Sequence, residues 1–211
     1  MTTPVFSEAE VRARLVRAGI ELDRSQHARL AQFFTSLAKW NRVHNLTGFR
    51  TVRDLLELNL VECLKLATWL EGERIADVGT GAGLPGVPLA IAAPGRTFTL
   101  IESRAKRVHF LRHVTAELGL GNARVAHGRA ETLAPEQPFD TVLARAVAAP
   151  AELLAIARHL TARGSILLVL TSAEIGEAYR GLAADFALRS IEPLRRQDGR
   201  GVIVRIERTS S

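Results

Sequence analysis

Apolar positions in the first seventy residues recur three or four places apart, which is the spacing of an amphipathic helix. One stripe follows Ser7 and Glu10, a pair with the spacing of a capping box. A second follows Asp23 and Gln26, and a third begins near Thr51. We expect the inward positions of these three helices to be Val11, Leu15 and Ala18, then Leu30, Phe33, Phe34, Leu37 and Trp40, and then Leu55, Leu56, Leu60, Leu64 and Ala67.

From Gly72 onward, short apolar runs alternate with helical segments. We expect strands at Arg74–Val78, Thr97–Ile101, Arg124–His127, Phe139–Ala144 and Ser165–Leu170. We expect helices between them at Val87–Ala93, Ala105–Leu118 and Ala151–Leu160. Such alternation produces right-handed crossover units and a parallel sheet.

The last part of the chain carries two strand-like runs, Phe186–Pro193 and Gly201–Glu207, linked through Gln197-Asp198-Gly199. Two strands without a helix between them pair antiparallel. The sequence therefore predicts an α/β fold: a Rossmann-like, mainly parallel, doubly wound sheet with an antiparallel C-terminal hairpin. A helical N-terminal extension at residues 1–72 is expected to pack on the core at residues 73–211.

The composition is that of a folded globular protein. A hydrophobic share of 47% and a charged share of 24% exclude wholesale disorder over the 211 residues. The single cysteine, Cys63, has no partner for an internal disulfide, which is typical of a reducing compartment. Neither a bilayer-spanning run nor a secretory signal is evident. We expect a cytoplasmic protein with no membrane association.

Basic side chains outnumber acidic ones by 28 to 22, which gives a net charge of +6. This excess favours an anionic partner such as nucleic acid. Six basic residues and one acid stand between residues 103 and 129. If Arg107 and Arg112 lie on the exposed face of their helix, reversing both charges is expected to weaken RNA binding and to spare the cofactor. The alternative is a compositional bias, since only three of the basic residues are lysines.

A glycine-rich segment, Asp77-Val-Gly-Thr-Gly-Ala-Gly-Leu-Pro-Gly86, joins the first expected strand to the helix that follows it. Glycine permits positive φ angles and lets a ligand approach the backbone closely. The next strand ends at Glu102, where an acid can accept hydrogen bonds from ribose hydroxyls. The position of the glycine-rich segment after a strand and the acid at the end of the next strand together predict a nucleotide-type ligand. Its site would consist of Asp77, Gly79, Gly81, Gly83 and Glu102.

Two classes of ligand share this layout. The segment satisfies the dinucleotide pattern Gly-x-Gly-x-x-Gly, but Pro85 supplies no N–H where a pyrophosphate needs donors. A carboxylate at Asp77 would repel a pyrophosphate and attract an ammonium or sulfonium group. The chain is also too short for a second, hydride-accepting domain. These features favour S-adenosylmethionine as the cofactor.

Two later strands end at positions that fit the same pocket. Ala130 and Glu131 follow the third strand, where their backbone groups would flank an adenine ring. Arg145 ends the fourth strand, over the expected position of the transferring methyl, because ligands bind at the carboxyl ends of such strands. We expect Arg145 to act at the site and no metal ion to take part.

Two features that the sequence lacks reduce the range of possible methyl acceptors. No Asn-Pro-Pro-aromatic motif follows the fourth strand, which disfavours methylation of an exocyclic amine. Cys63 lies on an N-terminal helix, which disfavours covalent attack on a pyrimidine carbon. Methylation of the guanine N7 needs neither a general base nor an enzyme nucleophile, because this nitrogen carries no proton and its lone pair is free. Alignment of that lone pair with the methyl would then supply most of the catalysis.

The chain resembles one family in several motifs along its length. These are Lys39-Trp40-Asn41, Asn45-Leu46-Thr47, the segment from Asp77 to Gly86, Lys106-Arg107 with Phe110-Leu111, and Arg145-Ala146. The family is the bacterial small-subunit ribosomal RNA guanine-N7 methyltransferase, also called glucose-inhibited division protein B.

The resemblance implies methyl transfer from S-adenosylmethionine to the N7 of a guanine in small-subunit (16S) ribosomal RNA. The RNA would be bound within the subunit or an assembly intermediate by a monomeric protein. By the same resemblance, Gly79 and Leu84 line the methionine and ribose side, and Glu102 matches a second-strand acid that is usually aspartate. Many relatives have His-x-x-Asp-Ser where this chain has Asn59-Leu-Val-Glu-Cys63, and often a lysine and glycine in place of Thr171-Ser172.

Two other hypotheses stay open at this point. One is a methyltransferase that acts on a small molecule or a protein. The other is a non-catalytic RNA-binding assembly factor, which retention of Asp77, Glu102 and Arg145 argues against.

Overall fold

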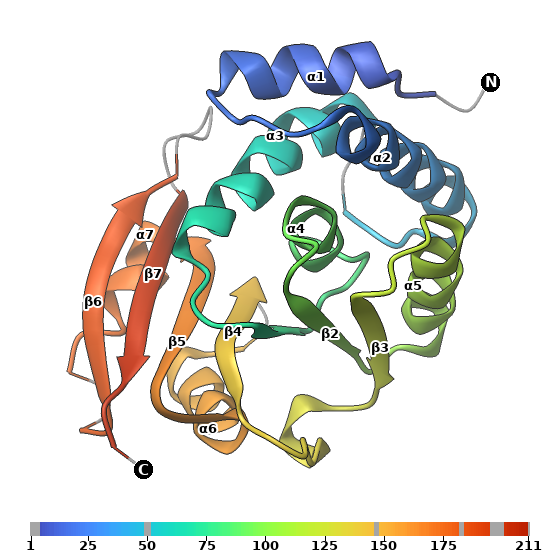
Figure 1. Cartoon of the computed structure of the whole chain (residues 1–211). Helices are drawn as coiled ribbons and strands as arrows, with labels where there is room; N and C mark the ends of the chain where they lie inside the picture. The colour runs from blue at the N-terminus through green and yellow to red at the C-terminus, as the bar shows by residue number, and fades with distance from the viewer. Residues whose placement is uncertain (1–4, 49–51, 146–147, 182–183, 195–200, 211) are drawn as a thin grey trace.

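The computed structural model of the chain describes residues 5–48, 52–145, 148–181, 184–194 and 201–210. Its centre is a sheet with the strand order β3-β2-β1-β4-β5-β7-β6 (Figure 1). β1 to β5 are parallel, and β7 runs antiparallel to both of its neighbours. The strands are β1 (Arg74–Val78), β2 (Thr97–Glu102), β3 (Ala123–His127), β4 (Phe139–Arg145), β5 (Thr161–Ser172), β6 (Phe186–Pro193) and β7 (Gly201–Arg208).

Helices cover both faces of the sheet. The α-helices are α1 (Glu8–Arg17), α2 (Arg24–His44), α3 (Val52–Lys65), α4 (Gly86–Ala92), α5 (Ala105–Glu117), α6 (Pro150–Leu160) and α7 (Ala173–Glu177). Two 3-10 helices, η1 (Leu66–Trp69) and η2 (Ala130–Thr132), complete the described elements. Figure 1 shows α3, α4 and α5 on one face of the sheet and α6 on the other. Within the described part of the chain, no helix combines the length and apolarity that crossing a bilayer requires.

The core consists of two apolar clusters, one on each face of the sheet. Ile75 and Leu100 belong to the cluster that includes the N-terminal helices, α4 and α5. Ala76 and Val78 belong to the cluster around α6. Successive residues of a strand point to opposite faces, so the alternation along β1 decides which helices each side chain meets.

The N-terminal helices begin where the sequence predicts. Ser7 with Glu10 and Asp23 with Gln26 both form capping boxes, so the first N–H groups of α1 and α2 are satisfied by side chains. α2 ends at His44, and Asn45 closes it in the left-handed region with a φ of +48°. The inward positions of α2 from Leu30 to Leu37 are buried as expected.

The predicted fold class is confirmed, with differences at the ends of elements. β5 is longer than the predicted Ser165–Leu170 at both ends, because Thr161 pairs with Phe139 of β4 and because Thr171 and Ser172 pair with β7. α7, η1 and η2 were not predicted. Three features named from the sequence lie outside the described residues. They are the link Gln197-Asp198-Gly199, the start of the third helix at Thr51, and Ala146.

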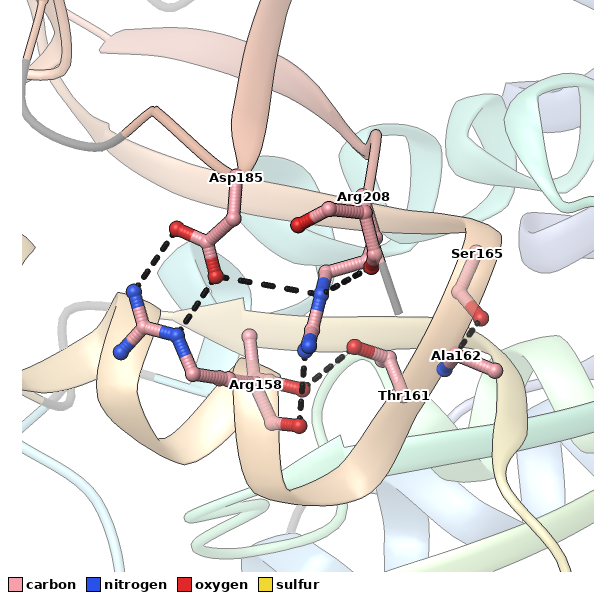
Figure 2. Close-up of polar contacts among 8 residues, drawn as sticks. Arg158, Thr161, Ala162, Ser165, Asp185 and Arg208 are labelled. Atoms are coloured by element: carbon pink, nitrogen blue, oxygen red, sulfur yellow. Dashed lines mark hydrogen bonds and ion pairs between the residues drawn. The ribbon is translucent and has the colours of Figure 1, made fainter.

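One ionic cluster ties the C-terminal hairpin to α6 (Figure 2). Arg158 donates two hydrogen bonds to the Asp185 carboxylate, at 2.6 and 2.8 Å. Arg208, which is buried, lies 3.9 Å from the same carboxylate and donates to the carbonyl of Arg158. Both guanidinium groups also lie over the ring of Phe186, at 5.7 and 5.4 Å from its centroid. These contacts hold the antiparallel edge against the parallel core.

Candidate cofactor and active site

The carboxyl ends of β1, β2 and β4 open into a cavity of about 590 Å³. It lies where the strand order reverses between β1 and β4, which is the usual ligand position in such sheets. Seven of the nine residues predicted for the cofactor line this cavity, and Asp77 and Gly83 do not. The seven are Gly79, Gly81, Leu84, Glu102, Ala130, Glu131 and Arg145.

The turn after β1 presents bare backbone to the cavity. Gly79 and Gly81 have φ angles of +61° and +62°, a region that other L-residues rarely adopt. The Thr80 N–H donates to the Ile101 carbonyl at 3.1 Å, which fastens the turn to the end of β2. A ligand can therefore approach the peptide groups of the turn directly.

Asp77 lies beneath the turn and not in the wall of the cavity. Its side chain is on the sheet face that α4 covers, and the residue is 1% exposed. One carboxylate oxygen accepts hydrogen bonds from the Thr80 hydroxyl at 2.6 Å and the Gly86 N–H at 2.8 Å. Burial raises the pKa of Asp77 to about 7, although both hydrogen bonds act to lower it. Asp77 thus supports the turn through this oxygen, and its expected contact with a ligand cation stays a prediction.

Gly83 also faces away from the cavity. With a φ of +85°, a Cβ there would lie 2.7 Å from Val87 and 3.1 Å from Leu111. This glycine therefore permits α4 to pack closely against α5.

The start of α4 leaves few donors for a pyrophosphate. The Gly86 N–H is taken by Asp77, and the Val87 N–H donates to the Gly83 carbonyl at 2.8 Å. Residue 88 is a proline and has no N–H. A phosphate bound at a helix N-terminus needs free N–H groups there, so this geometry fits a cationic ligand better than a dinucleotide.

Glu102 joins the turn to the residues after β2. Its carboxylate accepts hydrogen bonds from the Gly81 N–H at 3.0 Å and the Arg104 N–H at 2.8 Å. Arg107 lies 3.5 Å from the same carboxylate. Each carboxylate oxygen has two lone pairs, so Glu102 keeps capacity to accept from ribose hydroxyls.

Arg107 lines the cavity and is only partly exposed. The condition on which its charge reversal was expected to spare the cofactor, a place on the exposed face of the helix, is therefore not met for Arg107. Arg112 is exposed and does not line the cavity, as that expectation requires.

The residues that follow β3 form the opposite wall of the cavity. The Gly128 N–H donates to the Glu102 carbonyl at 3.0 Å, which fixes the end of β3 beside β2. Ala130 and Glu131 follow in η2, with Ala130 buried and Glu131 exposed. This placement agrees with a role beside the adenine ring.

Arg145 is held by a buried residue of α3. One terminal nitrogen of its guanidinium donates a hydrogen bond to the amide oxygen of Asn59, which is fully buried. Glu62, one turn further along α3, is also buried. The stretch of α3 that departs from the family pattern therefore lies against the guanidinium of Arg145 at the wall of the cavity. No local feature of the sequence connects positions 86 residues apart, so this pair was not predicted.

The loop after α2 forms part of the cavity wall through Leu46, Thr47 and Gly48. The Thr47 N–H donates to the Asn41 side chain at 2.7 Å, which shapes this loop. Sequence reasoning used Asn45-Leu46-Thr47 as a family motif but did not assign it to the cofactor site.

Sequence comparison places the chain beside one group of enzymes. The model of the GidB family, described as rRNA small subunit methyltransferase G, matches residues 26–201. The protein named ribosomal RNA small subunit methyltransferase G from Nitrosococcus oceani is 40% identical over 174 residues, which are 82% of this chain and 81% of that protein. The protein of the same name from Salmonella agona is 39% identical over 181 residues, 86% and 87% of the two chains.

Solved structures with the same fold are more distant in sequence. The glycopeptide N-methyltransferase MtfA, in complex with S-adenosylmethionine, has a TM-score of 0.60 at 14% identity, over 72% of this chain and 94% of that one. A MtNAS mutant in complex with S-adenosylmethionine has a TM-score of 0.58 at 18% identity, over 96% and 77%. These likenesses establish the fold that the sequence predicts.

Proposed function

The chain belongs to the rRNA small subunit methyltransferase G family, and from this premise we propose that it transfers a methyl group from S-adenosylmethionine to the N7 of a guanine in small-subunit (16S) ribosomal RNA. The observation that carries the proposal is the cavity that brings the glycine turn, Glu102 and Arg145 together at the carboxyl ends of the strands. The acceptor would be RNA in a small subunit or an assembly intermediate, in the cytoplasm, with the protein acting as a monomer.

The residues around the cavity suit an adenosyl cation. Gly79, Gly81 and Leu84 would contact its methionine and ribose parts, Glu102 would accept from the ribose hydroxyls, and Ala130 with Glu131 would flank the adenine. When bound, the cofactor supplies an electrophilic methyl group on a sulfonium. The buried Glu102, itself fixed by Gly81 and Arg104, would orient the adenosyl part without movement of its own.

The chain's own task at the acceptor is alignment. The N7 of guanine carries no proton, so the reaction needs no general base, and an arginine cannot act as one. Arg145 presents donors in a planar fork that suits the guanine O6 or a neighbouring phosphate. A donor aimed at N7 itself would occupy the lone pair that must attack. The hydrogen bond to Asn59 fixes one side of the fork and so sets where its other donors point.

A labelled-methyl assay with three kinds of acceptor tests this function. The purified chain is incubated with S-adenosylmethionine labelled at the methyl group and, separately, with unmodified small ribosomal subunits, protein-free small-subunit RNA, and an RNA-free bacterial extract. We expect label in the RNA of the first or second sample. Label only in the extract would favour a protein or small-molecule methyltransferase. Cofactor binding with no transfer to any acceptor would favour a non-catalytic factor.

A further inference from the structure

The outer surface of the α2–α5 pair carries an unusual ring cluster. Trp40 of α2 is partly buried, and three exposed histidines surround it. The ring centroids of His44, His109 and His113 lie 5.2, 5.6 and 5.3 Å from that of Trp40. Phe110 packs beneath it at 5.5 Å. We call Trp40 and the exposed residues around it the α2–α5 face, and its members are Lys39, Trp40, His44, Lys106, His109, Arg112 and His113.

Positive charge on this face is free to meet a ligand. Lys39, Lys106 and Arg112 are exposed, and the structure shows no ion pair for them among the residues it describes. The nearby acid, Glu117, is already engaged. Its carboxylate accepts a hydrogen bond from Ser36 at 2.7 Å and lies 3.7 Å from His113.

The face leads to the mouth of the cofactor cavity. Ser36 contacts Glu117 and Trp40 contacts His109, so α2 and α5 run antiparallel. The end of α2 therefore lies beside the start of α5, and both continue into the cavity wall, through Thr47 on one side and Arg104 on the other. A helix rises about 1.5 Å per residue, so the face extends about 10 Å along α5 from Lys106 to His113. That length spans about three nucleotides stacked at about 3.4 Å.

We propose that the α2–α5 face binds the RNA next to the target guanine, a proposal that rests on the methyltransferase function proposed above. Lys39, Lys106 and Arg112 would attract phosphates, and the exposed imidazole rings would stack on unpaired bases. Imidazole and indole rings stack with bases of any sequence, which suits RNA whose target base must leave its stack. An acidic protein would use the cations and could pack against the rings, but flat rings set among cations match the alternating bases and phosphates of RNA, and RNA is the occupant to which we commit.

Two paired substitutions and a matched control test the proposal. Lys106→Glu/Arg112→Glu removes phosphate contacts, and His109→Ala/His113→Ala removes stacking. Arg17→Glu/Arg163→Glu makes the same change in net charge at exposed arginines on α1 and in the first part of β5. The Kd for protein-free small-subunit RNA is measured by filter binding over a salt series, together with kcat and KM for small subunits and the Kd for S-adenosylmethionine.

We expect Lys106→Glu/Arg112→Glu to raise the RNA Kd and the subunit KM at least about tenfold and to flatten the log–log salt slope by about 0.7 for each lost phosphate contact. His109→Ala/His113→Ala should raise both constants at least about fivefold with the salt slope unchanged, because stacking carries no charge. Cofactor affinity should be unchanged in both, since none of the four residues lines the cavity. The control should match the wild type.

Three outcomes would overturn this proposal, and only the last would also overturn the proposed function. If the wild type methylates subunits and both face variants keep its KM and salt slope, the face is not an RNA surface, although the function stands. If the charge variant and the control weaken binding equally, the effect is general electrostatics and the face is likewise rejected. If the wild type neither methylates nor binds the RNA, the proposed function fails and the face fails with it.

Discussion

Arg145 combines a permanent charge with a fixed direction, and this combination decides what the residue can do. A guanidinium cannot take up a proton at any relevant pH, so the contribution to methyl transfer that we propose for Arg145 is positional. The buried amide of Asn59 holds one edge of the fork, and the remaining donors are directed by that contact.

We expect Arg145→Ala to lower kcat at saturating cofactor at least about tenfold, because small misplacements of reacting groups cost about a hundredfold in rate. Arg145→Lys should rescue poorly, since an ammonium is a point charge and not a fork. Single-turnover methyl transfer to small subunits measures both. Turnover at the wild-type rate in the alanine variant would remove Arg145 from the site.

Asn59 is expected to act through Arg145. Asn59→Ala should lower kcat several-fold with little change in cofactor Kd. Combined with Arg145→Ala, it should lower kcat no further, because the two residues share one function. A double-mutant cycle on kcat, with thermal unfolding of each variant as a control for folding, checks this. Independent, multiplying losses would show that Asn59 has only a role in packing.

Asp77 is expected to make stability depend on pH. Its pKa is raised from an ordinary value of 3.8 to about 7, mainly by burial, so the folded state holds this proton over a range in which the unfolded chain has lost it. The contribution of the protonated Asp77 to the free energy of unfolding is therefore fully present below about pH 4. It is lost as the pH rises toward about 7, at up to about 1.4 kcal/mol per pH unit. Asp77→Asn should remove this part of the pH dependence. Urea unfolding at pH 5 and pH 8 measures it, and the same pH slope in both proteins would contradict the role of Asp77.

At the scale of elements, we expect the turn between β1 and α4 to select the ligand that the cavity binds. Its glycines give bare backbone on the cavity side, while the first N–H groups of α4 are either satisfied within the protein or absent. The turn thus differs from a dinucleotide site although it contains the dinucleotide glycine pattern.

We expect calorimetry to detect binding of S-adenosylmethionine and its demethylated product, and no binding of NAD. Gly79→Val should abolish cofactor binding, because a β-branched residue is strongly disfavoured at a φ of +61° and its side chain would stand in the ligand's approach. Gly95→Val is a matched control, since a Cβ at Gly95 would meet nothing within 4 Å. Binding of NAD alone would overturn the assignment.

Elements and site residues were predictable to different degrees. Apolar runs and capping pairs place β1 to β4 and the N-terminal helices to within a residue or two, because burial and caps are local signals. α7 was missed because it is short and follows β5 directly, where Ser172 caps it. Asp77 and Gly83 lie at the turn as predicted, but on the side of it that does not line the cavity. Their side depends on the alternation of β1 and on the packing of α4, which the motif alone does not express.

At the scale of the whole molecule, the N-terminal helices are part of the site as well as part of the core. The helices supply Asn59 behind Arg145 and half of the α2–α5 face, and the loop after α2 supplies the wall residues Leu46 and Thr47. The predicted boundary at residue 72 stays a description of sequence pattern, because the cavity draws on both sides of it. These long-range pairings could not be predicted, since they depend on which helices the folded sheet brings together.

The central claim is methyl transfer to the N7 of a guanine in small-subunit ribosomal RNA, and nucleoside analysis tests it most directly. Small subunits that lack the modification are incubated with the chain and labelled S-adenosylmethionine, and the RNA is digested to nucleosides and separated by mass spectrometry. We predict that the label appears in 7-methylguanosine and that the Arg145→Ala protein leaves it much reduced. Label in any other nucleoside, or no label in RNA that the protein binds, would contradict the assignment.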